Sequence, residues 1–142
     1  MTSANKVASH FLVMQDEENA DITNMKLQKL LYYAQGLYLA LHDRPLFSEK
    51  IVAWTHGPVV PEVYHKYKVH EGNPIPRPKR ASDPVLSDNK QAFLEEVYKV
   101  YGQFSAWKLR NMSHAEAPYI RAKGGEISHS SMKKYFSDYV KT

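Results

Sequence analysis

A single apolar segment near the start of the chain constrains the fold more than any other feature. Residues 24–42 contain no proline, and the Arg44-Pro45 pair that follows would stop a helix. Apolar side chains recur in this segment at the three- and four-residue spacing of one helix face, at Leu27, Leu30, Leu31, Ala34, Leu37, Tyr38 and Leu41. Further apolar residues fall on the other faces. The pattern predicts a helix over about 24–42, capped by Thr23 or Asn24 and surrounded by other elements.

The rest of the chain predicts shorter helices that are separated by turn residues. Apolar residues at helical spacing follow several residues that suit a helix start, namely Ser3, Pro61, Asp88, Ser105 and either Ser128 or Ser130. Two short apolar runs near 46–54 suggest a small hairpin or two extended pieces. We therefore expect a mainly α fold, with a compact bundle of about six helices around the central one. The whole bundle is expected to form one domain over 1–142.

The composition limits the chemistry and the location of the protein. The chain has 142 residues, enough for one domain with a buried core, and it contains no cysteine for disulfide or thiolate chemistry. No apolar run reaches the roughly 18–20 residues that span a bilayer. Residues 1–20 carry acidic side chains and lack the uninterrupted apolar block of a signal peptide. We therefore expect a cytoplasmic protein that has no membrane contact.

Residues 71–86 interrupt the helical patterns. Gly72 and the prolines in this segment exclude a regular helix and favour an extended loop within the domain. Arg77, Lys79 and Arg80 make it the one local basic patch. We interpret the segment as a solvated loop, with contact to a partner as the alternative.

Gly36 lies in the middle of the predicted central helix. Glycine costs about 1 kcal/mol relative to alanine at such a position. Lys29, Tyr33 and Ala40 share its stripe on the helix. We therefore predict that a second segment crosses the helix closely at Gly36.

Three motifs follow one another along the chain, and we call them the first, second and third signatures. They are residues 27–36 (LQKLLYYAQG), 53–64 (AWTHGPVVPEVY) and 113–119 (SHAEAPY). Together they resemble the signatures of the SocA-like, or Panacea, antitoxin domain, over roughly residues 5–125. The residues that carry the first two signatures are Leu27, Gln28, Lys29, Leu30, Tyr32, Tyr33, Trp54, His56, Gly57, Pro58, Val59, Pro61 and Tyr64. In the third signature, Tyr119 stands where the family commonly has tryptophan.

The resemblance implies a function in protein binding. Members of this family occur in bacteria and phages, are often encoded beside a toxin, and neutralise that toxin by direct binding. At least some act as adaptors that hand a partner to a protease. We therefore expect an antitoxin of a toxin–antitoxin system with a cognate toxin as protein partner, and we keep protease delivery as the alternative. The resemblance leaves the identity of the toxin open.

Two histidine-containing turns and nearby aromatic residues are candidates for the partner surface. His56 and His114 lie in turns, where an imidazole either caps backbone groups at a helix end or contacts a partner. We expect the two turns to converge on one side of the central helix. The candidate partner-binding residues are His56, Tyr64, Tyr67, Trp107, His114 and Glu116. Trp54 is expected in the core, whereas Trp107 suits either the core or an interface.

Enzymatic and nucleic-acid-binding functions fit the residues less well. The histidines form no His-Glu-x-x-His pair, and the chain has no Gly-x-Ser-x-Gly elbow or phosphate-binding glycine loop. We therefore expect no catalytic residue, no metal and no cofactor. The net charge of +4 permits a nucleic-acid partner. However, the tyrosines fall on the apolar helix stripes, where they serve the core, and this argues against nucleic-acid binding.

Overall fold

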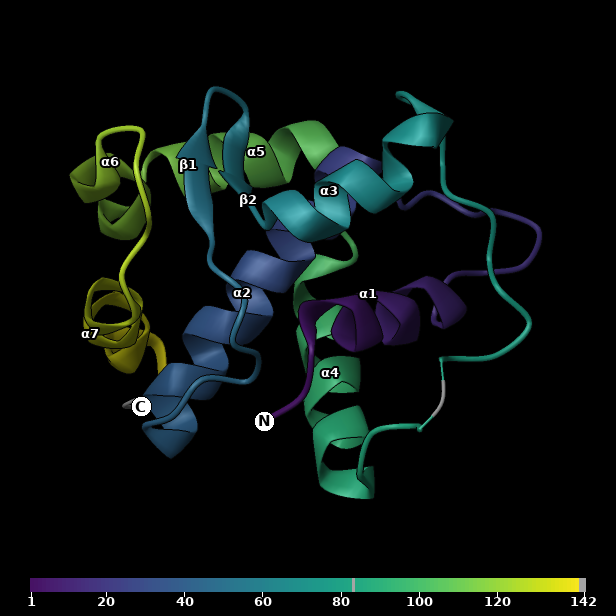
Figure 1. The fold of residues 1–142 in the computed structure, drawn as a ribbon, viewed down its shortest axis with the longest axis horizontal. Helices are drawn as coiled ribbons and strands as arrows, with labels where there is room; N and C mark the ends of the chain where they lie inside the picture. Colours follow the sequence, from purple (N-terminus) through teal and green to yellow (C-terminus); the bar gives the residue numbers. More distant parts are fainter. Residues whose placement is uncertain (83, 141–142) are drawn as a thin grey trace.

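The helix predicted over 24–42 is confirmed by the computed structural model of the chain, which describes residues 1–82 and 84–140. This helix, α2 (Asn24–His42), is capped by Thr23, whose side chain accepts a hydrogen bond from the backbone N–H of Lys26. Helices α1 (Ala4–Val13) and α4 (Asp88–Tyr101) pack on one side of α2, and α7 (His129–Val140) packs on another (Figure 1). The central helix is therefore surrounded, as its apolar faces predict.

A small hairpin and three short helices lie near the N-terminal end of α2 (Figure 1). Strand β1 (Val52–Trp54) pairs with β2 (Gly57–Val59) in antiparallel register, and α3 (Pro61–Tyr67) follows, continued by a 3-10 turn (Lys68–His70). The remaining helices are α5 (Ala106–His114) and α6 (Ala117–Ala122). The described residues thus hold seven α-helices, where the sequence suggested about six. None of these helices is both long and apolar enough to cross a membrane.

The hairpin lies further along the chain than the sequence suggested. Its loop is Thr55-His56, so Gly57 and Pro58 begin the second strand. The run Leu46-Phe47 forms no part of it, because Gln35 of α2 holds that backbone: its amide oxygen accepts from the N–H groups of Leu46 (2.8 Å) and Phe47 (3.2 Å). A polar side chain on the central helix therefore decides where the strand pairing begins.

Most of the predicted helix starts are confirmed, and one shifts by a residue. Ser3 and Ser105 cap α1 and α5, Pro61 is the first residue of α3, and the Ser128 hydroxyl accepts from the N–H of Ser131 at the start of α7. The cap of α4 is Ser87, whose hydroxyl accepts from the N–H of Lys90, rather than the predicted Asp88. The side chain of Gln91 donates to the Leu86 carbonyl beside this cap. The shift is small, because adjacent serine and aspartate suit the same position.

The close crossing predicted at Gly36 is confirmed. A Cβ placed on Gly36 would stand 2.3 Å from two ring carbons of Phe136, on α7. The same ring meets Tyr32 and Tyr33 edge-on, at centroid distances of 5.6 and 5.8 Å. Phe136 is fully buried. The absence of a side chain at Gly36 therefore lets the last helix lie against the central one.

The described residues of segment 71–86 form no helix and most of them are exposed, as expected for a loop, but the segment is also held against α1 as a strap. Arg77 donates to the Val13 carbonyl and pairs with Glu17, both at 2.9 Å. Ile75 and Leu86 are buried and contribute to the core. Asp83, within this segment, and residues 141–142, within the expected domain, lie outside the described residues. Burial of two apolar side chains and the use of Arg77 inside the fold explain why the segment stays on the surface of α1.

Candidate functional site

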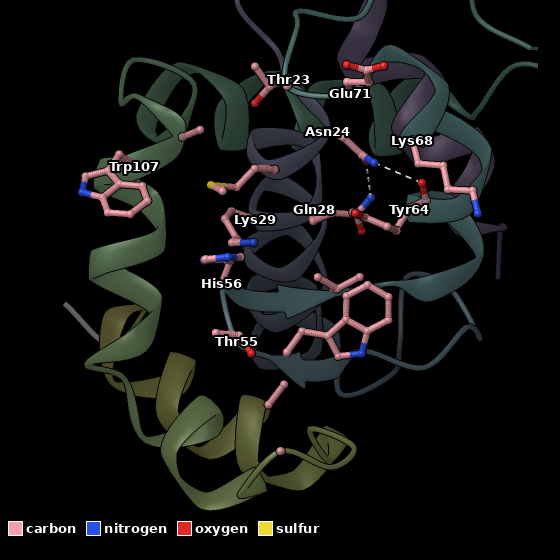
Figure 2. Close-up of a pocket in the computed structure, with 17 residues that line it drawn as sticks. Thr23, Asn24, Gln28, Lys29, Thr55, His56, Tyr64, Lys68, Glu71 and Trp107 are labelled. Carbon is pink, nitrogen blue, oxygen red and sulfur yellow. Dashed lines mark hydrogen bonds between the residues drawn. The ribbon is translucent and has the colours of Figure 1, made fainter.

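A groove of about 980 Å³ lies between the hairpin with α3 on one side and α5 on the other (Figure 2). The N-terminal half of α2 forms its floor. The functional side chains that line it are Asn24, Gln28, Lys29, Trp54, Thr55, His56, Tyr64, Lys68, Glu71 and Trp107. The groove therefore joins residues of the first two signatures with a tryptophan of α5.

One wall of the groove is aromatic. The rings of Trp54 and Tyr64 meet edge-to-face with centroids 5.1 Å apart. Trp54 is half-buried and lines the groove, so its expected place in the core was wrong. The reason is the alternation of strand β1, which turns Ala53 inward and Trp54 outward. This wall offers apolar ring surface with polar edges, as protein interfaces often do.

The opposite edge of the groove carries an exposed tryptophan. Trp107 is 57% exposed and lies on α5. The guanidinium of Arg110, one helical turn on, stacks 4.6 Å from the centroid of the indole. Trp107 therefore belongs to the surface, the second of the two places that the sequence left open.

Two buried amides fix the hairpin and α3 to the floor. The Gln28 side chain accepts from the Val60 N–H (2.9 Å) and donates to Asn24 (2.9 Å), and Asn24 donates to the Tyr64 carbonyl (3.0 Å). Figure 2 shows the last two bonds as dashed lines. All these groups lie at or below the groove surface, so its walls are held in place before any partner arrives. This role was not predicted from the sequence, although a pair of amides four residues apart on an otherwise apolar helix was a signal for it.

Lys29 and Gly57 bring the first two signatures into contact. Lys29 is 1% exposed, and its Nζ donates only a long hydrogen bond of 3.4 Å to the Pro58 carbonyl. Gly57 has φ +111°, and a Cβ there would stand 2.6 Å from Cε of Lys29. Glycine is thus required twice, for its backbone angle and for the approach of the lysine. Burial, with a further contribution from Arg110, lowers the pKa of Lys29 to about 7.

The two histidine turns converge, as predicted. Ser113 Oγ would stand 3.2 Å from a Cβ on Gly57, and His114 forms a hydrogen bond with the backbone of Thr55. The imidazole of His114 stacks on the Tyr119 ring at 4.4 Å, and the Tyr119 hydroxyl donates to the Trp54 carbonyl at 2.5 Å. The third signature therefore packs against the hairpin and is hydrogen-bonded to it.

His114 carries a lowered pKa. Burial is the largest cause, followed by the positive charges of Arg110 and Lys29, while the bond to the Thr55 backbone opposes them. The charge of His56 lowers the pKa of His114 further. Basic groups from three elements are thus gathered at one place beneath the hairpin turn.

Glu116 is buried and satisfied inside the domain. Its two carboxylate oxygens accept hydrogen bonds of 2.8 Å from the hydroxyls of Tyr32 and Tyr33. Tyr33 in turn stacks on Tyr101, with ring centroids 4.1 Å apart. Burial raises the pKa of Glu116, and the two tyrosine hydrogen bonds oppose that rise. Glu116 therefore ties the third signature to the central helix, and its oxygens are already used.

The six candidate partner residues thus lie in four different environments. His56, Tyr64 and Trp107 line the groove, and His114 lies under its hairpin wall. Glu116 is interior, and Tyr67 packs against the core outside the groove lining. Among residues 1–82 and 84–140, no three His, Cys, Asp or Glu side chains are grouped as metal ligands would be.

Comparison with known proteins identifies the three signatures. The family described as "Antitoxin SocA-like, Panacea domain" matches residues 27–119, which include all of them. The chain belongs to this family. Most residues that line the groove fall inside the part matched by the Panacea domain.

A curated relative of the Panacea family gives the same assignment. Antitoxin SocA of Caulobacter vibrioides (strain NA1000 / CB15N) is 33% identical to this chain over 104 residues, which are 66% of this chain and 55% of that protein. The chain thus matches about half the length of that relative. No solved structure matches this Panacea domain.

Proposed function

We propose that the protein is an antitoxin that neutralises a cognate toxin by direct protein–protein binding. The observation that carries this proposal is the groove between Trp54-Tyr64 and Trp107, which is built where the three family signatures meet. Tryptophan and tyrosine supply much of the binding energy at protein interfaces because they bury large apolar surfaces and keep a polar edge. Membership of the antitoxin SocA-like family supports the antitoxin role.

The groove is suited to binding a partner protein without catalysing a reaction on it. Its walls are fixed by Gln28 and Asn24, so little ordering of the antitoxin is needed when a partner docks. We propose that the bound toxin is inactivated by occlusion, with no catalytic residue, metal or cofactor contributed by this chain. A partner segment that enters the groove would cover the ring surfaces of Trp54, Tyr64 and Trp107.

Co-expression with a toxin candidate from the adjacent gene tests the proposal. The variant Trp107→Ala with His56→Ala and Tyr64→Ala is expected to lose the rescue of cell growth while its melting temperature stays close to that of the wild type. Tyr139→Ala is the matched control, because Tyr139 is similarly exposed (55%) but lies on α7, away from the groove. Full rescue by the triple variant would show that the toxin binds elsewhere.

The same cells distinguish occlusion from delivery to a protease. Under occlusion the half-life of the toxin is unchanged or longer when the antitoxin is present. A shortened half-life, together with intact rescue, would favour the adaptor mechanism instead.

A further inference from the structure

We infer that Lys29, at the floor of the groove, forms an anion site with His56, Arg110 and His114 around it, and that this site receives an acidic side chain of the partner protein. The inference rests on the proposed function, because it names the chemistry by which that groove recognises its partner. It predicts that the toxin presents an aspartate or glutamate flanked by apolar residues.

Lys29 is the deepest member of this site and lacks a counter-charge. Among the described residues it makes one hydrogen bond, the 3.4 Å contact with the Pro58 carbonyl, although an ammonium group has three donors. Lys26, also 1% exposed, shows the usual arrangement, since it binds Asp21 at 2.9 Å and the Gly102 carbonyl at 2.7 Å. A buried cation normally has such partners, because leaving it unpaired is costly. Lys29 thus has donors to spare at the groove floor.

Two side chains of α5 also have unused polar atoms at this place. Nε of Arg110 and Nε2 of His114 are buried, and neither has a hydrogen-bond partner within residues 1–82 and 84–140. The one hydrogen bond from the Arg110 guanidinium goes to the neutral Asn111 side chain, at 3.0 Å. Buried polar atoms without partners are few in folded proteins, and beside a groove a bound water or a ligand group can satisfy them.

The charged groups around the site are mostly of one sign. Lys29 comes from α2, His56 from the hairpin turn, and Arg110 and His114 from α5; each of the first three lowers the pKa of His114. Tyr64, on α3, also lines the groove. Within the described ranges, neither Lys29 nor Arg110 has a carboxylate oxygen within 4.0 Å.

Neither Glu116 nor Glu71 supplies a counter-charge to the site. The oxygens of Glu116 accept from two tyrosines, and Glu71, the one acid among the lining residues, lies at the Thr23 end of the groove, away from His56 (Figure 2). The negative charge that this site lacks must therefore come from outside the described chain. A partner carboxylate would accept from the ammonium of Lys29 and the guanidinium of Arg110 while the aromatic walls exclude water.

Matched lysine variants test the site with the toxin candidate. Lys29→Met keeps the stem that packs on Gly57 and removes the charge, so affinity for the toxin is expected to fall by about 30-fold or more. Arg110→Gln, on the half-buried face of α5, is a second variant, with a loss of about tenfold. Lys26→Met is the control, expected within about twofold of the wild type, because Lys26 does not line the groove. Unchanged affinity in both site variants would overturn the anion site and leave the antitoxin function standing.

A test with acetate needs no toxin. Sodium acetate, compared with sodium chloride at equal ionic strength, is expected to shift the amide NMR signals of Ser113 and His114 saturably in the wild type and not in Lys29→Met. Absence of a saturable shift in the wild type would overturn the site. Saturation by inorganic phosphate at much lower concentration than acetate, or salt-dependent binding of a short DNA duplex that Lys29→Met abolishes, would assign the site to a phosphate ligand instead. An acetate response in a chain that binds no toxin would leave the site and refute the proposed function.

Discussion

Lys26 and Lys29 are both 1% exposed and lie one helical turn apart on α2, but only Lys26 contacts a carboxylate. Lys26 binds Asp21 and the Gly102 carbonyl, whereas Lys29 reaches only the Pro58 carbonyl at 3.4 Å. Two lysines of equal burial on one helix are therefore placed for different purposes. The first is paired within the fold, and the second has unused donors at the groove floor.

This difference predicts opposite effects on stability. Lys26→Met removes two hydrogen bonds from a charged donor and leaves the Gly102 carbonyl unpaired, so it should cost about 1–3 kcal/mol. Lys29→Met removes a buried charge without a counter-ion, so it should leave the free energy of unfolding unchanged or raise it. Urea unfolding of the two variants at pH 7 measures both. A loss of stability in Lys29→Met as large as in Lys26→Met would contradict the difference.

Stability should rise with pH in a way that depends on Lys29. Its pKa is about 7 in the folded protein and 10.5 ordinarily, so between these values the unfolded chain binds more protons than the folded one. The free energy of unfolding therefore increases with pH from about 7 upwards, and the increase is absent below that value. The comparison is between wild type and Lys29→Met at pH 6 to 9, because groups common to both cancel. Parallel pH profiles for the two proteins would refute the lowered pKa.

The contact between Gly36 and Phe136 predicts that a single methyl group added at position 36 lowers the stability of the protein. Gly36→Ala gains about 1 kcal/mol in helix propensity, but its Cβ would lie 2.3 Å from the phenylalanine ring. We expect a net loss of about 1–3 kcal/mol, and a larger loss for Gly36→Leu. Gly72→Ala is the control, since no atom lies within 4 Å of its Cβ position. Thermal unfolding of the three variants decides, and an unchanged melting temperature for Gly36→Leu would disprove the close crossing.

The buried Glu116 predicts a second pH effect, of opposite sign. Burial raises its pKa above the ordinary 4.5, so the folded state holds the proton more tightly than the unfolded state. This contribution to stability is fully present below pH 4.5 and is lost as pH rises through the folded pKa. Glu116→Gln should remove this loss of stability with rising pH, because a glutamine side chain does not ionise. Its amide can still accept a hydrogen bond from one tyrosine and donate one to the other.

The alanine variant at the same position separates charge from hydrogen bonding. Glu116→Ala leaves the hydroxyls of Tyr32 and Tyr33 buried without an acceptor, at a cost of about 1–3 kcal/mol. Unfolding followed between pH 4 and pH 7 distinguishes the two variants. Equal destabilisation by glutamine and alanine across this range would show that the two hydrogen bonds require the carboxylate.

The helices and the crossing at Gly36 could be predicted from the sequence, because both follow from the spacing of residue types within one segment. The place of Trp54 could not be predicted in this way, since it depends on which strand residues pair across the hairpin. The burial of Gln28 and Gln35 could not be predicted from the sequence either. A sequence shows that an amide lies on an apolar helix, but it does not show which loop backbone comes to meet it.

The candidate site was predicted in part for a related reason. Residue type and position make His56, Tyr64 and Trp107 candidates for partner binding, and all three line the groove. Glu116 was recognised by its motif, but motif membership does not distinguish a side chain that faces a partner from one that holds two tyrosines. Among the described residues Lys29 has no carboxylate partner. This depends on which side chains the fold brings near it, and the sequence does not show that.

The strap over α1 has a consequence for where this protein can be cut. The family match begins at residue 27, but α1 contributes the buried Val7 and Phe11, and Arg77 of the strap is bonded to its last turn. At the other end, Phe136 covers Gly36 from beyond residue 119. A fragment trimmed to the matched region would expose apolar surface at both ends. The smallest fragment that we expect to fold independently therefore includes α1 and α7.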